Sequence, residues 1–249
     1  MTGFVDLHTH VIPGVDDGPA TLEETIEVLR AAYDAGTRAL VATPHMFMPM
    51  FDNRSASAIR QAFAELIAAL GFMSRRDPDA AFLTELELFL GAENFCSAEF
   101  VTALDKGEIL TLNDGRHLLL EFGPHLPLDS IESALLRVLD SGLVPLLAHV
   151  ERYPFFSGNG MRRLGSLVEK GCVAQVNAES VVAPRLSRSR RAAMRFLKSG
   201  LVTIVASDTH DTHMRRPRLD EAWTVLAARF GDTRATAWMV TNPRAVIGS

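Results

Sequence analysis

The stretch Phe4-Val5-Asp6-Leu7-His8-Thr9-His10 joins a short apolar run to two histidines at alternate positions. The apolar part is typical of a buried strand, and side chains two residues apart on a strand point to the same side. The two imidazoles can therefore bind one metal ion together. A His-x-His pair alone is weak support for a site, because histidine pairs are also common in cores and on surfaces.

The same arrangement recurs along the chain. Short apolar runs are followed by His45, by Glu93, by His149, and by the pair Asp208 and His210. Imidazole and carboxylate groups gathered at the ends of successive strands are what a site for several metal ions requires. The recurrence therefore predicts one shared metal site.

Strand and helix signals alternate along the 249 residues. The predicted strands cover residues 4–7, 39–42, 82–90, 118–122, 144–148, 173–177 and 202–206. The predicted helices cover residues 21–36, 57–70, 97–104, 128–139, 161–170 and 187–198, and a mostly helical tail follows from residue 219. Repeated βα units imply parallel strands with right-handed crossovers.

About seven such units fit, fewer than the eight of a complete barrel. No linker-like break interrupts them, so we predict an α/β fold with a single domain spanning residues 1–249. Active residues of such barrels occupy the C-terminal ends of the strands, and each candidate ligand falls at one.

Two connections carry more specific expectations. Residues 73–79 are polar and predict a loop. Leu110 to Leu112 and Leu118 to Phe122 predict a strand pair joined by a tight turn at Asn113-Asp114-Gly115.

Composition limits the class of protein. No apolar stretch reaches the roughly 20 residues that span a bilayer, and no signal-peptide pattern opens the chain, so we expect a cytoplasmic protein that is not an integral membrane protein. The net charge of −5 argues against a nucleic-acid partner. The run Arg185 to Arg195 is locally basic, and we interpret it as the solvated face of a helix.

Two arginines are candidates for binding phosphate. Arg152 and Arg215 follow predicted ligands closely, and a guanidinium can bind phosphate with two hydrogen bonds. Arg216 is an alternative to Arg215. Asn177 ends a predicted strand and can support a ligand.

Other candidates rank lower. Asp16 and Asp17 lie in Pro13-Gly14-Val15-Asp16-Asp17-Gly18-Pro19, which is ordinary turn sequence. Glu85 and Glu87 lie deeper in a predicted strand than Glu93. We interpret the remaining three histidines as structural or surface residues: His117, His125 and His213.

The sequence lacks the motif of cysteine-based phosphatases. It needs an arginine six positions after the cysteine, but Thr102 follows Cys96 at that distance and Ala178 follows Cys172. Neither a phosphate-binding loop of the Gly-x-x-x-x-Gly-Lys type nor a nucleophile elbow is present.

Taken together, the motifs resemble those of the PHP (polymerase and histidinol phosphatase) superfamily. Within it, they resemble the metal-dependent protein-tyrosine phosphatases of bacterial capsule and exopolysaccharide gene clusters. The motifs that carry the resemblance over nearly the whole chain are Asp6-Leu7-His8-Thr9-His10, Asp16-Asp17-Gly18-Pro19, Ala42-Thr43-Pro44-His45, Gly91-Ala92-Glu93, Leu119-Leu120-Glu121-Phe122, His149-Val150-Glu151-Arg152-Tyr153, Gln175-Val176-Asn177, Ser207-Asp208-Thr209-His210 and Asn242-Pro243-Arg244.

The resemblance implies a distorted (β/α)7 barrel that holds up to three divalent ions, manganese foremost, with iron, cobalt and zinc also compatible with mixed sites. It implies a first set of ligands made of His8, His10, Glu93 and Asp208, a second made of Glu93, His45 and His149, and a third made of Asp17 and His210. It further implies that Arg152 and an arginine near Arg215 hold the phosphate, and that His210 takes part in catalysis. Met214-Arg215-Arg216-Pro217 departs from the Gly-Arg-Pro element of the family, which leaves the second arginine open.

The implied substrate is a phosphotyrosine-containing protein, such as the tail of a bacterial tyrosine kinase, and a homo-oligomer is compatible with the sequence. Three alternatives stay open. They are a small-molecule phosphomonoesterase such as a histidinol-phosphate phosphatase, an amidohydrolase-type enzyme, and a non-catalytic metal-stabilised scaffold of a polysaccharide assembly system. The amidohydrolase alternative ranks low because no lysine ends a predicted strand.

Overall fold

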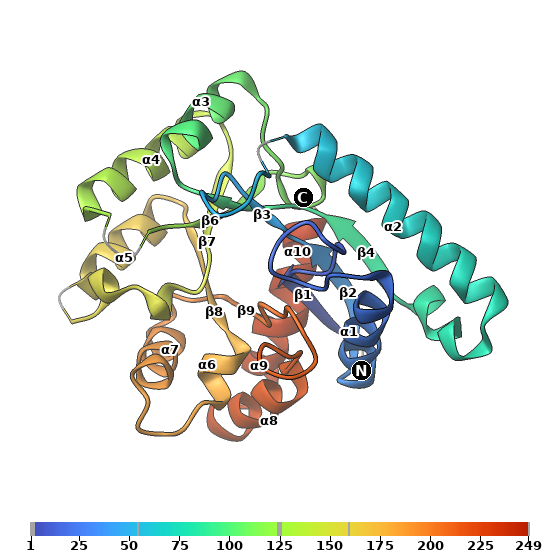
Figure 1. Cartoon of the computed structure of the whole chain (residues 1–249). Coiled ribbons are helices and arrows are strands. Elements are labelled where there is room, and N and C mark those ends of the chain that lie inside the picture. The colour runs from blue at the N-terminus through green and yellow to red at the C-terminus, as the bar shows by residue number, and fades with distance from the viewer. Residues whose placement is uncertain (1–2, 54, 124–125, 159, 249) are drawn as a thin grey trace.

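The structure is a computed structural model that describes residues 3–53, 55–123, 126–158 and 160–248. Its strands form a curled parallel sheet, a half-barrel with helices around the outside (Figure 1). The strands are β1 (Phe4–Thr9), β2 (Thr37–Ala42), β3 (His45–Met46), β4 (Glu87–Leu90), β5 (Glu93–Phe95), β6 (His117–Glu121), β7 (Val144–Leu147), β8 (Val173–Asn177) and β9 (Ile204–Ala206).

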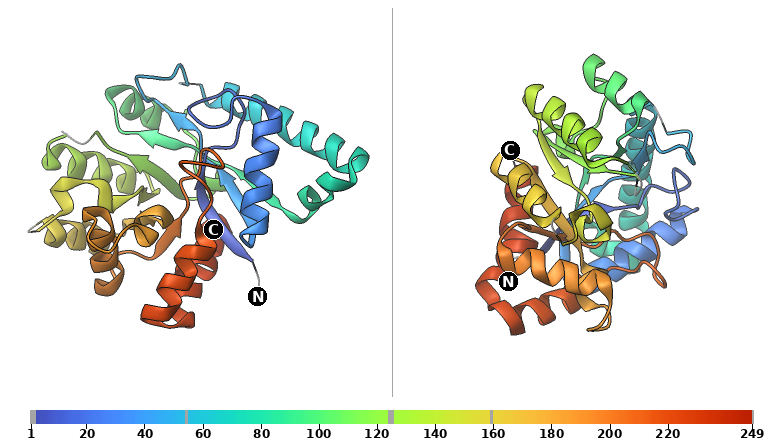
Figure 2. Two further views of the ribbon diagram at one scale, coloured as in Figure 1. Left: turned by 60° about the horizontal axis from the view of Figure 1, so that its bottom comes forward. Right: turned by 90° about the vertical axis from the view of Figure 1, so that its left-hand side faces the viewer.

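Helices connect the strands, as the predicted alternation requires. They are α1 (Leu22–Asp34), α2 (Ala56–Arg76), α3 (Ala98–Lys106), α4 (Leu128–Asp140), α5 (Gly160–Glu169), α6 (Ala178–Val182), α7 (Arg188–Ser199), α8 (Leu219–Phe230), α9 (Asp232–Thr236) and α10 (Asn242–Ile247). Short 3-10 turns are η1 (Pro78–Glu85), η2 (Leu112–Asp114), η3 (Val150–Arg152) and η4 (Pro154–Phe156), and a π-helical turn is η5 (Ala237–Thr241). The carboxyl-terminal helices lie beside the amino-terminal strand (Figure 2).

The strands form two hydrogen-bonded groups, β1-β2-β4 and β3-β5-β6-β7-β8-β9. Backbone bonds from Gly91 N to Ala42 O, at 2.8 Å, and from Glu93 N to Pro44 O, at 3.1 Å, continue one group into the other. At the far end, Asp208 N donates to His8 O at 2.9 Å, just after β9. The last strand therefore returns to the first, and their carboxyl ends meet.

Helix boundaries follow the local sequence signals. Thr21 caps α1, because its hydroxyl accepts a hydrogen bond from Glu24 N at 3.2 Å. Gly200 ends α7 with a φ of 79°, a left-handed conformation that suits glycine. Both boundaries were predicted from the sequence.

The segment between residues 71 and 90 differs from the prediction. Helix α2 continues through Gly71 to Arg76, where a loop is predicted. The predicted strand at residues 82–90 is shorter, because Pro78 to Glu85 forms a 3-10 turn that buries Phe82 and Leu83. A short apolar run can be buried either in a strand or in a turn, and its periodicity does not separate the two.

The predicted strand pair at residues 110–122 is also wrong. Asn113 and Asp114 do turn the chain, with φ values of 53° and 54°. However, β6 pairs in parallel with β5 and β7, and Leu112 is buried within η2. The Asn113 side-chain amide donates instead to Ile247 O at 2.9 Å, so this turn packs against helix α10.

Two hydrophobic clusters support the fold. The larger one lies between the sheet and the helices. The smaller one includes Val41, Leu119, Leu146 and Ile204, which come from strands on different sides of the curl, together with Leu112. The smaller cluster therefore fills the inside of the curled sheet.

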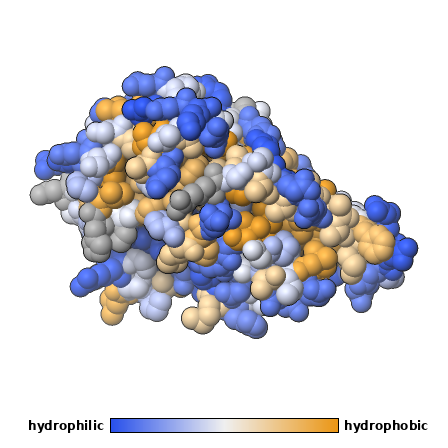
Figure 3. Space-filling view, turned by 45° about the horizontal axis from the view of Figure 1, so that its top comes forward, coloured by the Kyte–Doolittle hydropathy of each residue, from blue (hydrophilic) through white to orange (hydrophobic). Residues whose placement is uncertain are grey.

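Helix α2 projects from the molecule at the right of Figure 1. By length and composition, it is the one helix of the described residues that could cross a membrane. Of its most apolar stretch, 17% is buried inside the protein. Ile59, Leu66 and Leu70 are buried and pack into the larger cluster. The projecting end shows hydrophobic and hydrophilic residues mixed together (Figure 3), so composition alone is weak support for a membrane span.

We predict that Leu112→Ala lowers the free energy of unfolding by about 2 to 5 kcal/mol, because the cavity it leaves inside the sheet cannot collapse. Urea unfolding of the metal-free protein measures the loss. Leu136→Ala is the matched control, since Leu136 on α4 is 39% exposed and should change stability by about 0.5 kcal/mol or less. Equal losses in the two variants would contradict the placement of Leu112.

Candidate metal centre

All eight predicted ligands lie together at the carboxyl edge of the sheet. His8 is in β1 and His10 directly follows it, while His45 opens β3 and Glu93 opens β5. His149 follows β7, and the loop after β9 supplies Asp208 and His210. The eighth, Asp17, comes from the turn that follows β1. A cavity of about 370 Å³ opens beside them and is lined by Asp17, His45, Glu93 and His149.

Glu93 is at the centre of this arrangement and is 1% exposed. Its Oε2 lies 3.2 Å from His8 Nε2 and 3.0 Å from His45 Nδ1. Its Oε1 lies 2.9 Å from His149 Nε2. Burial acts to raise the pKa of Glu93, but His8 and the other imidazoles hold it well below its usual value. The carboxylate is therefore ionised, with its two oxygens facing different imidazoles.

Three groups of side chains bring ligand atoms within 4.8 Å of one another. The first is His8, His10 and Glu93, with Asp208 Oδ1 3.4 Å from His8 Nε2. The second is His45, Glu93 and Glu121, and the third is His10, Asp17, His45 and His210. These groups share residues, which is the geometry of ions held close together.

Glu121 is the residue that sequence reasoning missed. It ends β6, its Oε2 lies 3.6 Å from His45 Nδ1, and its Oε1 lies 3.7 Å from His149 Nε2. Burial raises its pKa, and so does the nearby charge of Glu93. Its position at the end of a predicted strand is the same signal that identified the other candidate ligands, and it would have identified Glu121 too.

The adjacent residues Asp16 and Asp17, in the turn after β1, have different roles. Asp17 Oδ1 lies 3.1 Å from His210 Nε2 and 3.4 Å from His45 Nε2, so Asp17 faces the site. Asp16 lies behind His10, with Oδ2 2.7 Å from His10 Nδ1, and it also accepts a hydrogen bond from His45 N at 3.0 Å. Asp16 therefore orients His10 so that its Nε2 points toward Glu93.

Two polar residues of β8 orient predicted ligands on the other side of the site. Gln175 Nε2 lies 3.2 Å from His8 Nδ1 and donates to it. Asn177 Nδ2 donates to Asp208 Oδ2 at 2.7 Å, which places Asn177 where the sequence suggested.

The backbone is strained at two of the predicted ligands. His149 has a φ of 33° and Asp208 a φ of 57°, both in the left-handed region. Such conformations cost about 1 to 3 kcal/mol each and persist where the surrounding structure fixes them, often at functional sites.

Two arginines approach the site from its open side. Arg152 Nη1 donates to Asp208 Oδ2 at 3.1 Å, and Arg215 donates to Asp208 Oδ1 at 2.9 Å and to Asp17 Oδ2 at 3.1 Å. Both also line the cavity. Arg216 instead pairs with Glu221 at 2.8 Å, so Arg215 is the arginine that faces the site.

The donor set fits divalent metal ions. Mixed imidazole and carboxylate groups suit manganese, iron, cobalt and zinc. Within the described part of the chain, Glu121 Oε2 is buried without a hydrogen-bond partner, and buried His45 Nδ1 and His210 Nε2 lie 3.0 and 3.1 Å from carboxylate oxygens without hydrogen-bond geometry. Buried polar atoms without such a partner are costly, and a metal ion would satisfy all three.

The pKa values of three histidines bear on metal binding. Burial acts to lower the pKa of His10 and that of His45, but Asp16 raises the first to about 9 and Asp17 with Glu93 raises the second to about 11. Burial and the nearby His10 lower the pKa of His210 to about 4, so its imidazole is neutral. A metal ion must therefore displace protons from His10 and His45 to bind there.

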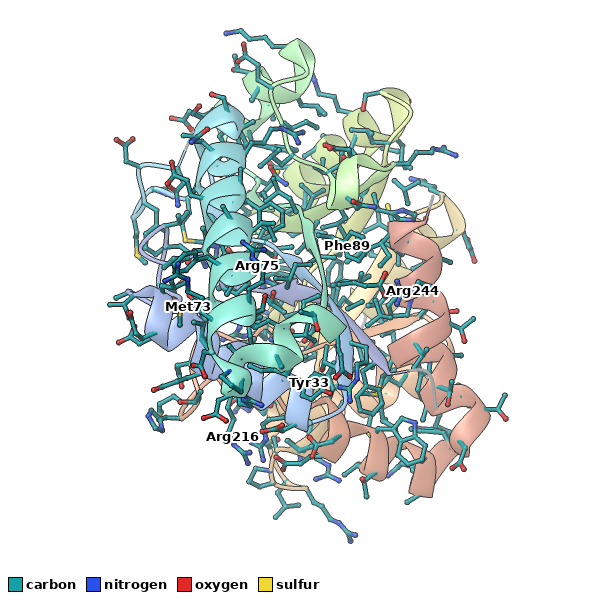
Figure 4. All side chains as sticks on the ribbon, turned by 90° about the vertical axis from the view of Figure 1, so that its right-hand side faces the viewer. Tyr33, Met73, Arg75, Phe89, Arg216 and Arg244 are labelled. Carbon is teal, nitrogen blue, oxygen red and sulfur yellow. The ribbon has the colours of Figure 1, made fainter. Side chains whose placement is uncertain are left out.

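The lower-ranked acidic residues lie in other contacts. The Tyr33 hydroxyl donates to Glu85 at 2.7 Å, and Arg244 pairs with Glu87 at 2.7 Å, joining α10 to β4 (Figure 4). His213 is exposed, as interpreted from the sequence, while His125 lies outside the described residues. Burial raises the pKa of both free cysteines, Cys96 and Cys172, to about 11, so neither is a ready nucleophile.

Comparison with known proteins agrees with this geometry. Residues 4–248 match the family described as capsular polysaccharide synthesis, CpsB/CapC. The chain is 32% identical over 249 residues to the tyrosine-protein phosphatase CpsB of Streptococcus pneumoniae, and the match covers 98% of each chain. It is 31% identical over 229 residues to the tyrosine-protein phosphatase YwqE of Bacillus subtilis, which covers 92% of this chain and 85% of that relative.

A solved structure also matches this chain. It comes from work on YwqE from Bacillus subtilis and CpsB from Streptococcus pneumoniae, described as unique metal-dependent tyrosine phosphatases. It superposes with a TM-score of 0.86 at 28% identity and covers 98% of this chain and 94% of that chain. The resemblance drawn from the sequence motifs is confirmed, and the chain belongs to the CpsB/CapC family of capsular polysaccharide synthesis.

Proposed function

We propose that this protein is a metal-dependent protein-tyrosine phosphatase that acts in capsular polysaccharide synthesis. The observation that carries the proposal is the buried Glu93 carboxylate, surrounded by histidines and placed beside two arginines on a cavity. Imidazoles and carboxylates supply the metal ligands, while guanidinium groups suit a phosphoryl group.

The proposal includes the architecture. The 249-residue chain forms one domain, residues 1–249, with a distorted (β/α)7 barrel, in which β2 with β3, and β4 with β5, each act as one interrupted strand. The bonds from Gly91 to Ala42 and from Asp208 to His8 support this, because they connect neighbouring strands around the curl.

The proposed metal ligands follow the three groups of donor atoms. One ion takes His8, His10, Glu93 and Asp208, a second takes His45, Glu93, His149 and Glu121, and a third takes Asp17 and His210 with His10 or His45 nearby. Manganese is the proposed metal, and iron, cobalt and zinc would suit the same donors.

Bound divalent ions would lower the pKa of a water molecule and place positive charge beside the phosphoryl oxygens. The chain itself supplies the rest. Arg152 and Arg215 hold phosphoryl oxygens as negative charge develops on them. Both arginines pair with Asp208, and Arg215 also pairs with Asp17; metal ions bound by these carboxylates would leave both guanidinium groups to the substrate.

The cavity favours an aromatic leaving group over a small polar one. Its wall includes Phe51, Phe122 and Tyr153, and also Met48 and Met50. These side chains suit a tyrosyl ring better than the polar chain of a substrate such as histidinol phosphate. A phenolate with a pKa of about 10 departs more easily than an alkoxide, so the site has little need of a strong general acid.

The biological setting follows from the family. We propose a cytoplasmic enzyme whose substrate is a phosphotyrosine-bearing protein, such as a bacterial tyrosine kinase of the capsule system. Neither a nucleic-acid partner nor the non-catalytic scaffold is needed to account for the site.

We predict that phosphatase activity toward phosphotyrosyl peptides and p-nitrophenyl phosphate requires divalent metal and no thiol. Chelation should abolish turnover, because the site then lacks its positive charge. Alkylation should leave most of the activity, since both cysteines are protonated near neutral pH. Turnover in excess chelator, or its loss in a Cys96→Ser and Cys172→Ser double variant, would refute the assignment.

We predict that Glu93→Ala removes more metal than any single histidine substitution, because its two oxygens serve two ions. Elemental analysis of purified variants measures metal per chain. Asn177→Ala is the control, because a residue that supports a ligand should weaken metal affinity by only about 10- to 100-fold. Unchanged metal content in Glu93→Ala would exclude Glu93 as a ligand.

We predict that Arg152→Lys lowers kcat/KM by about 10- to 100-fold, because one charge-assisted hydrogen bond in the transition state is worth about 1.5 to 3 kcal/mol. Metal content and the midpoint of thermal unfolding should stay near wild type. Arg216→Lys is the matched control, since Arg216 pairs with Glu221. If Arg152→Lys loses metal while turnover per loaded site is unchanged, Arg152 has a structural role.

A further inference from the structure

The basic run at residues 185–195, interpreted from the sequence as the solvated face of a helix, also borders a hollow. A hollow of about 950 Å³ lies between α7 and α8, and it is lined by side chains from both helices. Six of its lining residues are cationic and none is acidic within the described part of the chain: Arg185, Arg190, Arg191, Arg195, Lys198 and Arg229. In a chain with a net charge of −5, this is a strong local excess of positive charge.

The cations on α7 are ordered along the helix. Arg188, Arg191, Arg195 and Lys198 are spaced by three, four and three residues, which places them on one face. The row is about 15 Å long at 1.5 Å per residue. Like charges at this spacing destabilise a helix, and no ion pair to any of the four is found among the described residues. A bound anion would relieve this repulsion.

The amino-terminal end of this row lies near residues that border the metal centre. Arg191 and Arg195 line a second hollow of about 230 Å³ together with Arg188 and Phe156. Phe156 lies 6.2 Å from the ring of Tyr153, which lines the cavity at the metal centre beside Arg152. Helix α7 also packs directly on η3, the turn that contains Arg152.

We propose that this surface, from Arg229 to Arg188, docks an acidic segment of the phosphoprotein substrate whose phosphotyrosine occupies the metal centre. The proposal rests on the phosphatase function proposed above. An extended chain of about four residues matches the length of the row at 3.4 Å per residue. Met194 and Val225 give the hollow an apolar floor for the peptide's other side chains.

The shape and composition favour a peptide over other polyanions. The cations line a hollow, whereas a membrane surface is contacted by groups that project. No aromatic ring among the described residues lines the larger hollow, so it lacks the stacking platform typical of single-stranded nucleic-acid sites.

The test compares two phosphotyrosyl peptides, one flanked by glutamates and one by glutamines, with p-nitrophenyl phosphate as the small substrate. In the double variant Arg191→Ala and Arg195→Ala, kcat/KM for the glutamate peptide should fall by about 2- to 30-fold, because two exposed charge contacts with the glutamates are lost. The glutamine peptide and p-nitrophenyl phosphate should be turned over as by wild type.

The matched control is Arg75→Ala with Arg76→Ala, which removes two cations from the end of α2 (Figure 4) and should leave all three substrates unaffected. No change for the glutamate peptide, or equal losses on all three substrates in the α7 variant, would overturn the docking proposal.

Binding separates this proposal from the phosphatase function. Fluorescence anisotropy with an unphosphorylated glutamate peptide should show salt-sensitive binding to wild type that the α7 variant weakens, whether or not the protein hydrolyses phosphate. If the wild-type protein does not bind this peptide but binds phosphatidylserine vesicles or an RNA oligonucleotide through the same arginines, the acidic-peptide proposal is wrong.

Discussion

The buried carboxylate of Glu93 is the interaction on which the arrangement of the rim depends. Its oxygens lie within 3.5 Å of imidazole nitrogens from His8, His10, His45 and His149, which three separate βα units supply. A buried charge costs several kcal/mol unless it is paired, so those strand ends must converge on it. The pKa values of His10 and His45 are raised by the carboxylates around them, so divalent ions that bind beside this charge would displace their protons.

Much of the candidate site could be predicted from the sequence because each candidate ligand requires only two local signals. An apolar run marks a buried strand, and a histidine or carboxylate at its end faces the rim. His8, His45, Glu93 and Asp208 follow this rule and lie together in the structure. Glu121 follows the same rule, but the apolar runs around Asn113-Asp114-Gly115 are typical of a hairpin, which hides the fact that Glu121 ends a parallel strand.

Other features depended on contacts that local sequence cannot reveal. Asp16 and Asp17 occupy the same turn, and only the packing of His10 against one of them separates their roles. Arg215 and Arg216 are likewise adjacent, and Glu221 on α8 accounts for the second. The parallel sheet was predicted correctly from the βα alternation, whereas the segment from residue 71 to 90 and the false hairpin were not, because apolar runs in turns resemble short strands.

The most direct test is a crystal structure of the manganese-loaded protein with anomalous scattering data that locate the ions. We expect two ions close together, with one oxygen of Glu93 on each, and a third ion at Asp17 and His210. Manganese bound elsewhere in the protein, or ions at the rim that do not contact Glu93, would contradict the central claim that this carboxylate organises the metal centre.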